Sequence, residues 1–284
     1  MSQTYAALDH RFDIRCDHPA LAEELARIFA PLRAPGATAD VHYEVVIGQP
    51  ERPPYRLLAD GEELLSSRRA SRPLGHLLHH VNVSAIEQSQ HLTLLHGACA
   101  ATAGGAVLLP APMESGKSTL VTGLVRAGWG YLTDELLALD PSTGRIHPYP
   151  RAISLDSGSW ELFHELAPPP DREVARFRPH QWQVPAEMLG TVVREPMSVA
   201  AVVFPRYEAG SSTELTQLDP VEGLRQLLAS CFTLREQPRR DVEVLARLMD
   251  RVDAHELTMG DLEPAVTTVV EHMSGDRALT AHPL

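Results

Sequence analysis

Short stretches of alternating polar and apolar residues occupy the first ninety positions of the chain, with amphipathic helical stretches between them. A period of two is typical of half-buried strands, and apolar residues three or four positions apart are typical of a helix face. The expected elements are a strand over 10–16, a helix with apolar residues from 21 to 32, a strand over 41–47, a hairpin around 59–61 and a helix from about 74 to 86. Asp17 is placed to cap the first helix, with Pro19 in its first turn. We therefore predict that residues 1–88 form a small N-terminal mixed α/β unit.

From residue 91 onward the apolar runs are more continuous, as expected of strands buried on both faces. The expected strands cover 91–100, 106–109, 131–133, 136–139, 199–204 and 255–258, and the expected helices cover 117–127, 220 onward, 241–252 and 261–273. Residues 167–190 are rich in proline and polar side chains, which predicts a long loop. A strand, a glycine-bearing loop, a helix and a strand follow one another between 106 and 133, an order typical of an α/β nucleotide-binding domain. We predict that this domain covers residues 89–284.

The loop of this domain contains Lys117, the only lysine in the chain. Backbone N–H groups at a helix N-terminus point at an anion, and the helix dipole adds to them. In a phosphate-binding loop, or Walker A motif, Lys117 would reach the β- and γ-phosphates, Ser118 would bind Mg²⁺ and Thr119 would bond a phosphate oxygen. The predicted nucleotide-binding residues are Ala111, Glu114, Ser115, Gly116, Lys117, Ser118 and Thr119. The alternative is a helix start that binds nothing, and the apolar strand before the loop disfavours it.

Two acidic residues, Asp134 and Glu135, follow the next strand. A carboxylate at this strand end can hold Mg²⁺ through water or accept a proton from an attacking hydroxyl, so Asp134 is a candidate for both roles. Side chains alternate along a strand, so only one of the two is expected to face the phosphates directly. Glu135 is as consistent with a solvated strand end as with a metal ligand. The candidate metal ligands are Ser118, Asp134 and Glu135.

Histidines supply two further candidates. His96 ends the strand before the loop strand, where ligands of open α/β sheets bind, so it is a candidate acid/base or phosphate contact. A strand-end histidine with purely structural hydrogen bonds is an equally good interpretation. His76, His79 and His80 share one predicted helix, but no carboxylate or cysteine joins them at ligand spacing, so we expect partly exposed helix residues rather than a metal site.

Composition limits the expected partners. The formal net charge is −12 and the basic residues form no stripe, so neither a nucleic acid nor an anionic membrane is an expected partner. Three separated cysteines without a CxxC pair favour a reducing compartment over a disulfide framework or a zinc site. The N-terminus lacks the pattern of a signal peptide, and no apolar run is long enough to span a bilayer. We therefore expect a cytoplasmic protein.

Several motifs taken together resemble the HPr kinase/phosphorylase superfamily, including the HPr-kinase-related kinases that tailor peptides. The motifs are His96-Gly97, the loop end Gly116-Lys117-Ser118-Thr119, the stretch Tyr131 to Glu135, and the later stretches 148–151 and 203–207. The resemblance covers about residues 90–235. It implies a P-loop core similar to that of phosphoenolpyruvate carboxykinase, a multimer, and transfer of phosphate from a nucleotide to a serine-like hydroxyl.

The same resemblance assigns roles to individual residues. It implies that Asp134 acts as general base, that Lys117 and Ser118 handle phosphates and Mg²⁺, and that His96 acts on the phosphate or the base side. The chain departs from the family at Ala111 and Glu114, where HPr kinases have glycine, and at Met113, where they have serine. Glycine at such positions permits close approach of the backbone to phosphate, and the charge of Glu114 is unfavourable beside a polyphosphate. No acidic residue near 149–151 matches the family's later metal-binding glutamate, so a bifunctional kinase/phosphorylase is not expected.

The sequence therefore predicts an Mg²⁺-dependent, ATP-using kinase whose acceptor is a hydroxyl on a peptide or a small molecule. Arg151 and Arg206 are candidates for neutralising phosphate charge, with ordinary surface arginines as the alternative. Two other classes stay open, namely a nucleotide-binding regulatory or scaffold protein in which Ala111 and Glu114 have silenced transfer, and a simple ATPase.

Overall fold

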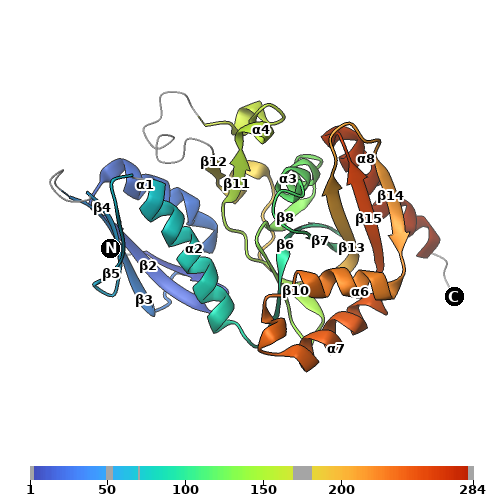
Figure 1. The fold of residues 1–284 in the computed structure, drawn as a ribbon, viewed down its shortest axis with the longest axis horizontal. Coiled ribbons are helices and arrows are strands. Elements are labelled where there is room, and N and C mark those ends of the chain that lie inside the picture. Colours follow the sequence, from blue (N-terminus) through green and yellow to red (C-terminus); the bar gives the residue numbers. More distant parts are fainter. Residues whose placement is uncertain (1–2, 49–53, 70, 169–180, 281–284) are drawn as a thin grey trace. The chain divides into compact units, whose positions relative to one another are not determined.

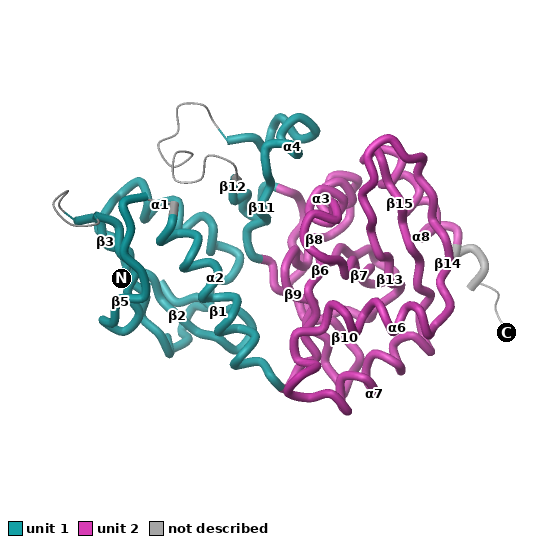
Figure 2. Tube along the Cα trace, viewed as in Figure 1, with its two compact units in different colours: residues 1–90, 151–188 teal, residues 91–150, 189–284 magenta. Residues whose placement is uncertain are grey.

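The computed structural model describes residues 3–48, 54–69, 71–168 and 181–280. The chain divides into two compact units, which Figure 2 colours separately. Unit 1 contains residues 1–90 and 151–188, and unit 2 contains residues 91–150 and 189–284. The segment 151–188, which lies within the predicted second domain, thus groups with the N-terminal unit.

Unit 1 contains a five-stranded sheet with the strands in the order of the sequence, β1-β2-β3-β4-β5, and α1 and α2 pack against it (Figure 1). The elements are β1 (Thr4–Ala7), β2 (His10–Cys16), α1 (Pro19–Ile28), β3 (Val41–Ile47), β4 (Tyr55–Ala59), β5 (Glu62–Ser67) and α2 (Ser71–Gln88). The predicted strands over 10–16 and 41–47 and the predicted hairpin are confirmed. In the hairpin turn, Asp60 and Gly61 have φ values of 49° and 85°, the left-handed values that a tight hairpin turn requires.

The predicted cap of α1 is wrong by one residue. The N-cap is His18, whose Nδ1 accepts a hydrogen bond from the backbone N–H of Leu21 at 3.3 Å. Asp17 is occupied elsewhere, because its Oδ1 accepts a hydrogen bond from the backbone N–H of Ile47 at 3.4 Å. The contact between Asp17 and β3 therefore leaves His18 to cap the helix. The local sequence pattern gives no sign of this contact.

The segment 151–188 adds a two-stranded sheet to unit 1, formed by β11 (Ile153–Asp156) and β12 (Gln181–Val184), with α4 (Ser157–Trp160) after the first strand. The predicted loop over 167–190 is wrong for its last part, which forms β12 and α5 (Ala186–Leu189); residues 169–180 lie outside the described residues. The guanidinium of Arg27 on α1 lies 5.0 Å from the ring centroid of Trp182, and its Nη1 lies 3.5 Å from the sulfur of Met188. These contacts explain why the segment groups with unit 1.

Unit 2 is built on an eight-stranded mixed sheet. Its strands are β6 (Thr93–Thr102), β7 (Gly105–Pro110), β8 (Gly130–Thr133), β9 (Leu136–Leu139), β10 (Arg145–His147), β13 (Met197–Tyr207), β14 (Glu214–Leu218) and β15 (Asp253–Met259). Its helices are α3 (Lys117–Arg126), α6 (Pro220–Ala229), α7 (Pro238–Met249) and α8 (Leu262–Thr280). The strand order is β10-β9-β6-β7-β13-β15-β14, with β8 also paired to β6.

The directions of these strands bring several strand ends to one edge of the sheet. β7, β13 and β15 are parallel, while β6 runs antiparallel both to β7 and to its other neighbours, β8 and β9. The carboxyl ends of β7, β8, β13 and β15 therefore point the same way, and the pairing of Gly97 with Pro110 puts this part of β6 beside the end of β7. Carboxyl edges of parallel strands are where α/β sheets bind ligands.

Helices cover both faces of this sheet (Figure 1). Ala254 of β15 belongs to a core shared with Leu227 of α6 and Leu245 of α7. The ring of the next residue, His255, meets the ring of His272 on α8 edge to face, with the ring centroids 4.4 Å apart. Because neighbouring side chains of a strand point to opposite faces, α6 and α7 lie on one face and α8 on the other. None of the helices in the described part of the chain is long and apolar enough to cross a membrane.

A buried polar network lies inside unit 1. The hydroxyl of Tyr43, which is fully buried, lies 3.1 Å from His10 Nε2 and 2.8 Å from His80 Nδ1. Gln88 donates to the other ring nitrogen of His10 at 3.0 Å. Burial raises the pKa of Tyr43 to about 12 and lowers the pKa of both histidines, so all three groups are neutral at pH 7. His80 thus has a structural role, and the described residues contain no group of three or more His, Cys, Asp and Glu side chains that could hold a metal.

We expect Tyr43→Phe to lower the free energy of unfolding of unit 1 by about 1–3 kcal/mol, because it leaves buried ring nitrogens without their hydroxyl partner. The matched control is Tyr55→Phe, since Tyr55 is only half-buried. Urea denaturation followed by circular dichroism measures both variants. Equal losses for the two variants would show that the hydroxyl network does not stabilise the unit.

Candidate functional site

The loop between β7 and α3 is held by close contacts at its carboxyl end. Gly116 is the N-cap of α3 and has a φ of 84°. A Cβ at this position would lie 2.5 Å from the Cε of Met259 and 3.3 Å from the Cβ of Tyr207, so both the backbone conformation and the available space require glycine. The backbone N–H of Tyr207 donates to the carbonyl of Ser115 at 3.2 Å. The end of β13 therefore fixes the loop at the predicted anion-binding position.

Lys117 lies inside the loop rather than in solvent. Only 7% of its surface is exposed, and its Nζ donates to the carbonyl of Pro112 at 3.1 Å. Burial lowers the pKa of the Lys117 ammonium, and the nearby carboxylates Asp134 and Glu135 oppose this shift. The ammonium thus spans the loop, where a compact charge with three donors fits and a planar guanidinium would not.

Ser118 and Asp134 are joined directly. The Ser118 hydroxyl, in the first turn of α3, donates to Asp134 Oδ2 at 2.9 Å, and Asp134 is 6% exposed at the end of β8. A hydroxyl and a carboxylate are the hard oxygen ligands that Mg²⁺ uses, with substrate phosphates completing its coordination. The two side chains therefore fit the predicted metal pair, and Thr119, half-buried in the same turn, lies next to them in the sequence.

Thr133 holds the turn that carries the acidic pair, a role that the sequence pattern did not indicate. Its Oγ1 accepts hydrogen bonds from the backbone N–H groups of Glu135 at 3.2 Å and Leu136 at 3.3 Å. Asp134 contacts the loop helix through Ser118, whereas Glu135 lines the cavity described below. The two carboxylates thus border the site from different sides, in keeping with the alternation along a strand.

His96 lies within β6, and the prediction that it ends the strand is wrong, because the strand continues to Thr102. The histidine is beside Glu135. Its Nδ1 is 3.2 Å from the carbonyl oxygen of Glu135, and the backbone N–H of Gly97 donates to the same oxygen at 3.3 Å. A Cβ at Gly97 would lie 2.8 Å from the Cα of Pro110, so glycine is required where β6 passes the end of β7. This packing brings the loop, the acidic pair and His96 to one edge of the sheet. His96 and Glu135 meet there although they are 39 residues apart in the sequence.

A cavity of about 940 Å³ opens at this edge of unit 2. Its lining comes from the loop, the end of β13, the middle of β15, α6 and the residues that follow α6. The lining residues that the sequence did not predict include Phe204, Arg225, Gln226, Ser230, Cys231, Phe232 and Glu256. They come from elements far along the chain, so only the strand order of the sheet could have revealed them.

The two predicted arginines have different positions. Arg206, at the end of β13, lines the cavity, and its Nη2 lies 3.1 Å from Glu208 Oε2 on the exposed side. Arg151 belongs to unit 1, and its Nε donates to the carbonyl of Ala152 at 3.3 Å. Of these two predicted arginines, Arg206 is therefore the one that unit 2 brings to the cavity.

Glu114 has an unusual backbone conformation. It lies in the left-handed region with φ 64°, at a position where the resembling family has glycine, and its side chain is exposed at the cavity. A residue with a Cβ is strained there by roughly 1–2 kcal/mol. Glu114 is therefore unfavourable for the backbone conformation that it adopts, and its charge would oppose an anionic ligand in the cavity.

We expect Glu114→Gly to tighten Mg-ATP binding, because it removes both the charge and the Cβ that limits close approach of phosphate to the loop backbone. Glu114→Gln is the matched control, since it removes the charge and keeps the Cβ. The charge of an exposed carboxylate is worth roughly 0.3–1 kcal/mol, so Gln should tighten binding about two- to fivefold and Gly somewhat more. Isothermal titration calorimetry measures both, and unchanged or weaker affinity in both variants would reject a charge penalty at Glu114.

No protein-family model matches the chain, and a search of curated proteins finds no match.

Proposed function

We propose that unit 2 is an Mg²⁺-dependent kinase that transfers the γ-phosphate of ATP to a hydroxyl on a peptide or a small molecule. The observation that carries the proposal is the hydrogen bond of 2.9 Å between Ser118 in the first turn of α3 and Asp134 at the end of β8. It puts a hydroxyl and a carboxylate, two groups suited to Mg²⁺, at the N-terminus of a helix that begins with the buried Lys117.

The loop binds the phosphates in this proposal. The backbone N–H groups from Ser115 to Ser118 and the dipole of α3 attract the phosphate oxygens. Lys117 exchanges its bond to the Pro112 carbonyl for bonds to the β- and γ-phosphates, so the ammonium keeps a partner in both states. Ser118 and Asp134 would hold Mg²⁺, which neutralises charge on the transferred group.

Asp134 also acts on the acceptor. The acceptor oxygen attacks the γ-phosphorus, the bond to the β–γ bridging oxygen breaks, and ADP leaves. The acceptor proton passes to the carboxylate of Asp134. His96 and Glu135 border the cavity next to this carboxylate and orient the acceptor.

The resemblance of the motifs to HPr-kinase-related enzymes supports the same reaction, and we propose an HPr-kinase-like, P-loop core similar to that of phosphoenolpyruvate carboxykinase. The mixed sheet with a loop at its carboxyl edge is consistent with such a core. The cavity of about 940 Å³ is large enough for a ligand of nucleotide size. We further propose that the protein acts in the cytoplasm and as a multimer.

The conformation of Glu114 favours one alternative, a nucleotide-binding regulatory or scaffold protein without transfer. A simple ATPase is the third class. Incubation of the full chain with γ-labelled ATP, Mg²⁺ and candidate hydroxyl acceptors separates the three. Label on an acceptor supports the kinase, label as free phosphate supports the ATPase, and ATP-dependent thermal stabilisation with neither supports the binding protein.

We expect Lys117→Ala to abolish the stabilisation of the protein by Mg-ATP, because the loop loses its only ammonium and nothing else can span it. Thermal unfolding with and without Mg-ATP measures the effect. Retention of the full ATP-dependent shift in the variant would contradict the phosphate-loop proposal itself.

For the chemical step, Asp134→Asn should lower phosphate transfer by about 10²–10⁴-fold, the contribution typical of a general base. The control is Asp250→Asn, an exposed aspartate that ends α7. Initial rates of transfer from labelled ATP measure both variants. A loss below about tenfold for Asp134→Asn would remove this residue from the role of base.

A further inference from the structure

One wall of the cavity is the segment Ser230–Phe232, which follows α6 and is called the 230–232 wall below. β7 ends opposite Gly97, and the wall takes the place beside β6 that β7 leaves open. The backbone N–H of His96 donates to the carbonyl of Ser230 at 2.8 Å, and the N–H of Phe232 donates to the carbonyl of Leu94, also at 2.8 Å. The wall is thus attached to the strand that carries His96.

The side chains of the wall face the cavity next to this histidine. The ring of Phe232 meets the imidazole of His96 edge to face, with the centroids 5.9 Å apart. Phe232 is 41% exposed, so much of its apolar surface is open to a ligand in the cavity. Because His96 also contacts Glu135, the wall lies on the side of the cavity where the acidic pair is.

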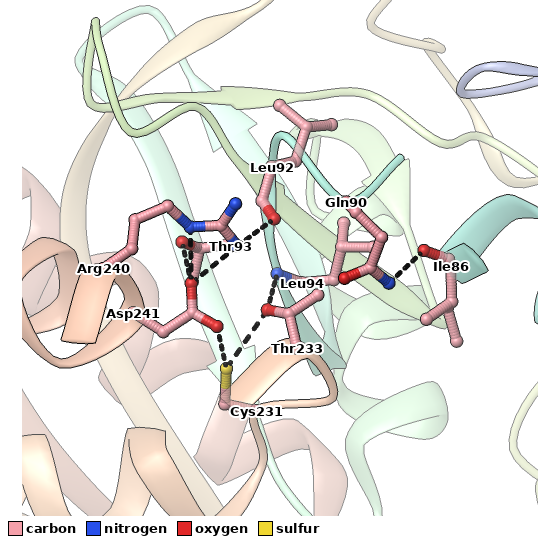
Figure 3. Close-up of polar contacts among 9 residues, drawn as sticks. All are labelled: Ile86, Gln90, Leu92, Thr93, Leu94, Cys231, Thr233, Arg240 and Asp241. Carbon is pink, nitrogen blue, oxygen red and sulfur yellow. Dashed lines mark hydrogen bonds and ion pairs between the residues drawn. The ribbon is translucent and has the colours of Figure 1, made fainter. Parts of the chain in front are cut away.

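A buried carboxylate lies behind the wall. Asp241, in the first turn of α7, has no exposed surface. Its Oδ1 accepts a hydrogen bond from the Thr93 hydroxyl at 2.8 Å, and its Oδ2 lies 3.7 Å from the thiol of Cys231 (Figure 3). Arg240 pairs with Oδ1 at 2.8 Å and donates to the carbonyl of Leu92 at 2.9 Å. The two oxygens of Asp241 therefore contact two different segments, the start of β6 and the wall.

Thr233 adds a second link between the same two segments. Its hydroxyl accepts a hydrogen bond from the backbone N–H of Leu94 at 3.3 Å and lies 3.6 Å from the thiol of Cys231. Hydrogen bonds fix direction as well as distance, and a buried carboxylate keeps them because leaving any of them unmade is costly. The network thus holds the wall in one position relative to His96.

We infer that the 230–232 wall is the acceptor side of the site and that Asp241 is the positioning residue that holds it there. The inference rests on the proposed kinase function. An acceptor hydroxyl must approach Asp134, and the wall is the part of the cavity lining attached beside His96 and Glu135. The nucleotide phosphates are bound by the loop, so displacement of the wall affects the acceptor and leaves nucleotide binding intact. A displacement of about 1 Å can cost about 10²-fold in rate.

The test compares wild type with Asp241→Asn, which keeps the shape of the side chain and removes its charge. Three quantities are measured on the full chain: the Kd of Mg-ATP, amide hydrogen exchange in peptides covering 92–99, 228–236 and 110–120, and phosphate transfer to three hydroxyl probes relative to transfer to water. The probes are L-serine, N-acetyl-L-serinamide and glycerol. Asp250→Asn on the same helix is the control, and Thr93→Val is a milder variant that removes one donor from Asp241.

We expect Asp241→Asn to speed amide hydrogen exchange at least about tenfold in the peptides 92–99 and 228–236. Exchange in the peptide 110–120 and the Kd of Mg-ATP should stay within about twofold of the wild-type values. The ratio of transfer to hydrolysis should fall at least about tenfold. Thr93→Val should change the same quantities in the same direction by less, and it decides the question if Asp241→Asn does not fold.

Other results overturn the inference. Unchanged exchange of the wall shows that Asp241 does not position it, and a looser wall with an unchanged transfer ratio shows that the wall does not serve the acceptor. Parallel losses in exchange protection, ATP affinity and both rates show a role in stability alone. If wild type binds Mg-ATP but transfers label to none of the probes, the kinase proposal fails and the inference fails with it.

Discussion

The antiparallel pairing of β6 with its neighbours is the constraint on which the site depends. β6 separates β7, which leads into the proposed phosphate loop, from β8, which is followed by the acidic pair. Because both neighbours run opposite to β6, their carboxyl ends lie at one edge of the sheet. The Ser118–Asp134 hydrogen bond connects the segments that follow these two strands. The same strand brings His96 to that edge and gives the 230–232 wall a place to attach.

The sequence could predict those features of the site that depend on neighbours in the chain. Lys117, Ser118 and Thr119 begin an amphipathic helix that follows an apolar strand and a short loop, so local pattern alone indicated the loop. The position of Gly116 was also predictable, although the reason for it was not, because Met259 and Tyr207 come from β15 and β13. A motif can therefore indicate a loop without indicating what holds it.

The features that the sequence missed depend on pairings between distant segments. Glu256 and Arg225 reach the cavity only because β15 lies beside β13 and α6 packs across that face, and no local pattern contains this order. The cap of α1 is a smaller case of the same limit, since Asp17 satisfies the cap pattern but bonds to β3 instead. Short strands with weak alternation, such as β1 and β14, were missed because their partners, rather than their own side chains, stabilise them.

The charges around the cavity explain why a cation must accompany the nucleotide in the proposed reaction. Three glutamates line the cavity, Glu114, Glu135 and Glu256. The two arginines of the lining already pair with carboxylates of their own, Arg206 with Glu208 and Arg225 with Glu222.

Positive potential for a triphosphate therefore comes from the loop amides and from Lys117. Burial already makes the charged form of this lysine less favourable. These sources do not balance the acidic lining and the phosphates together. A divalent ion between Ser118 and Asp134 would supply the missing charge at the point where the phosphates approach the carboxylates. In the proposed reaction, the acidic lining would thus make nucleotide binding as well as catalysis depend on the metal.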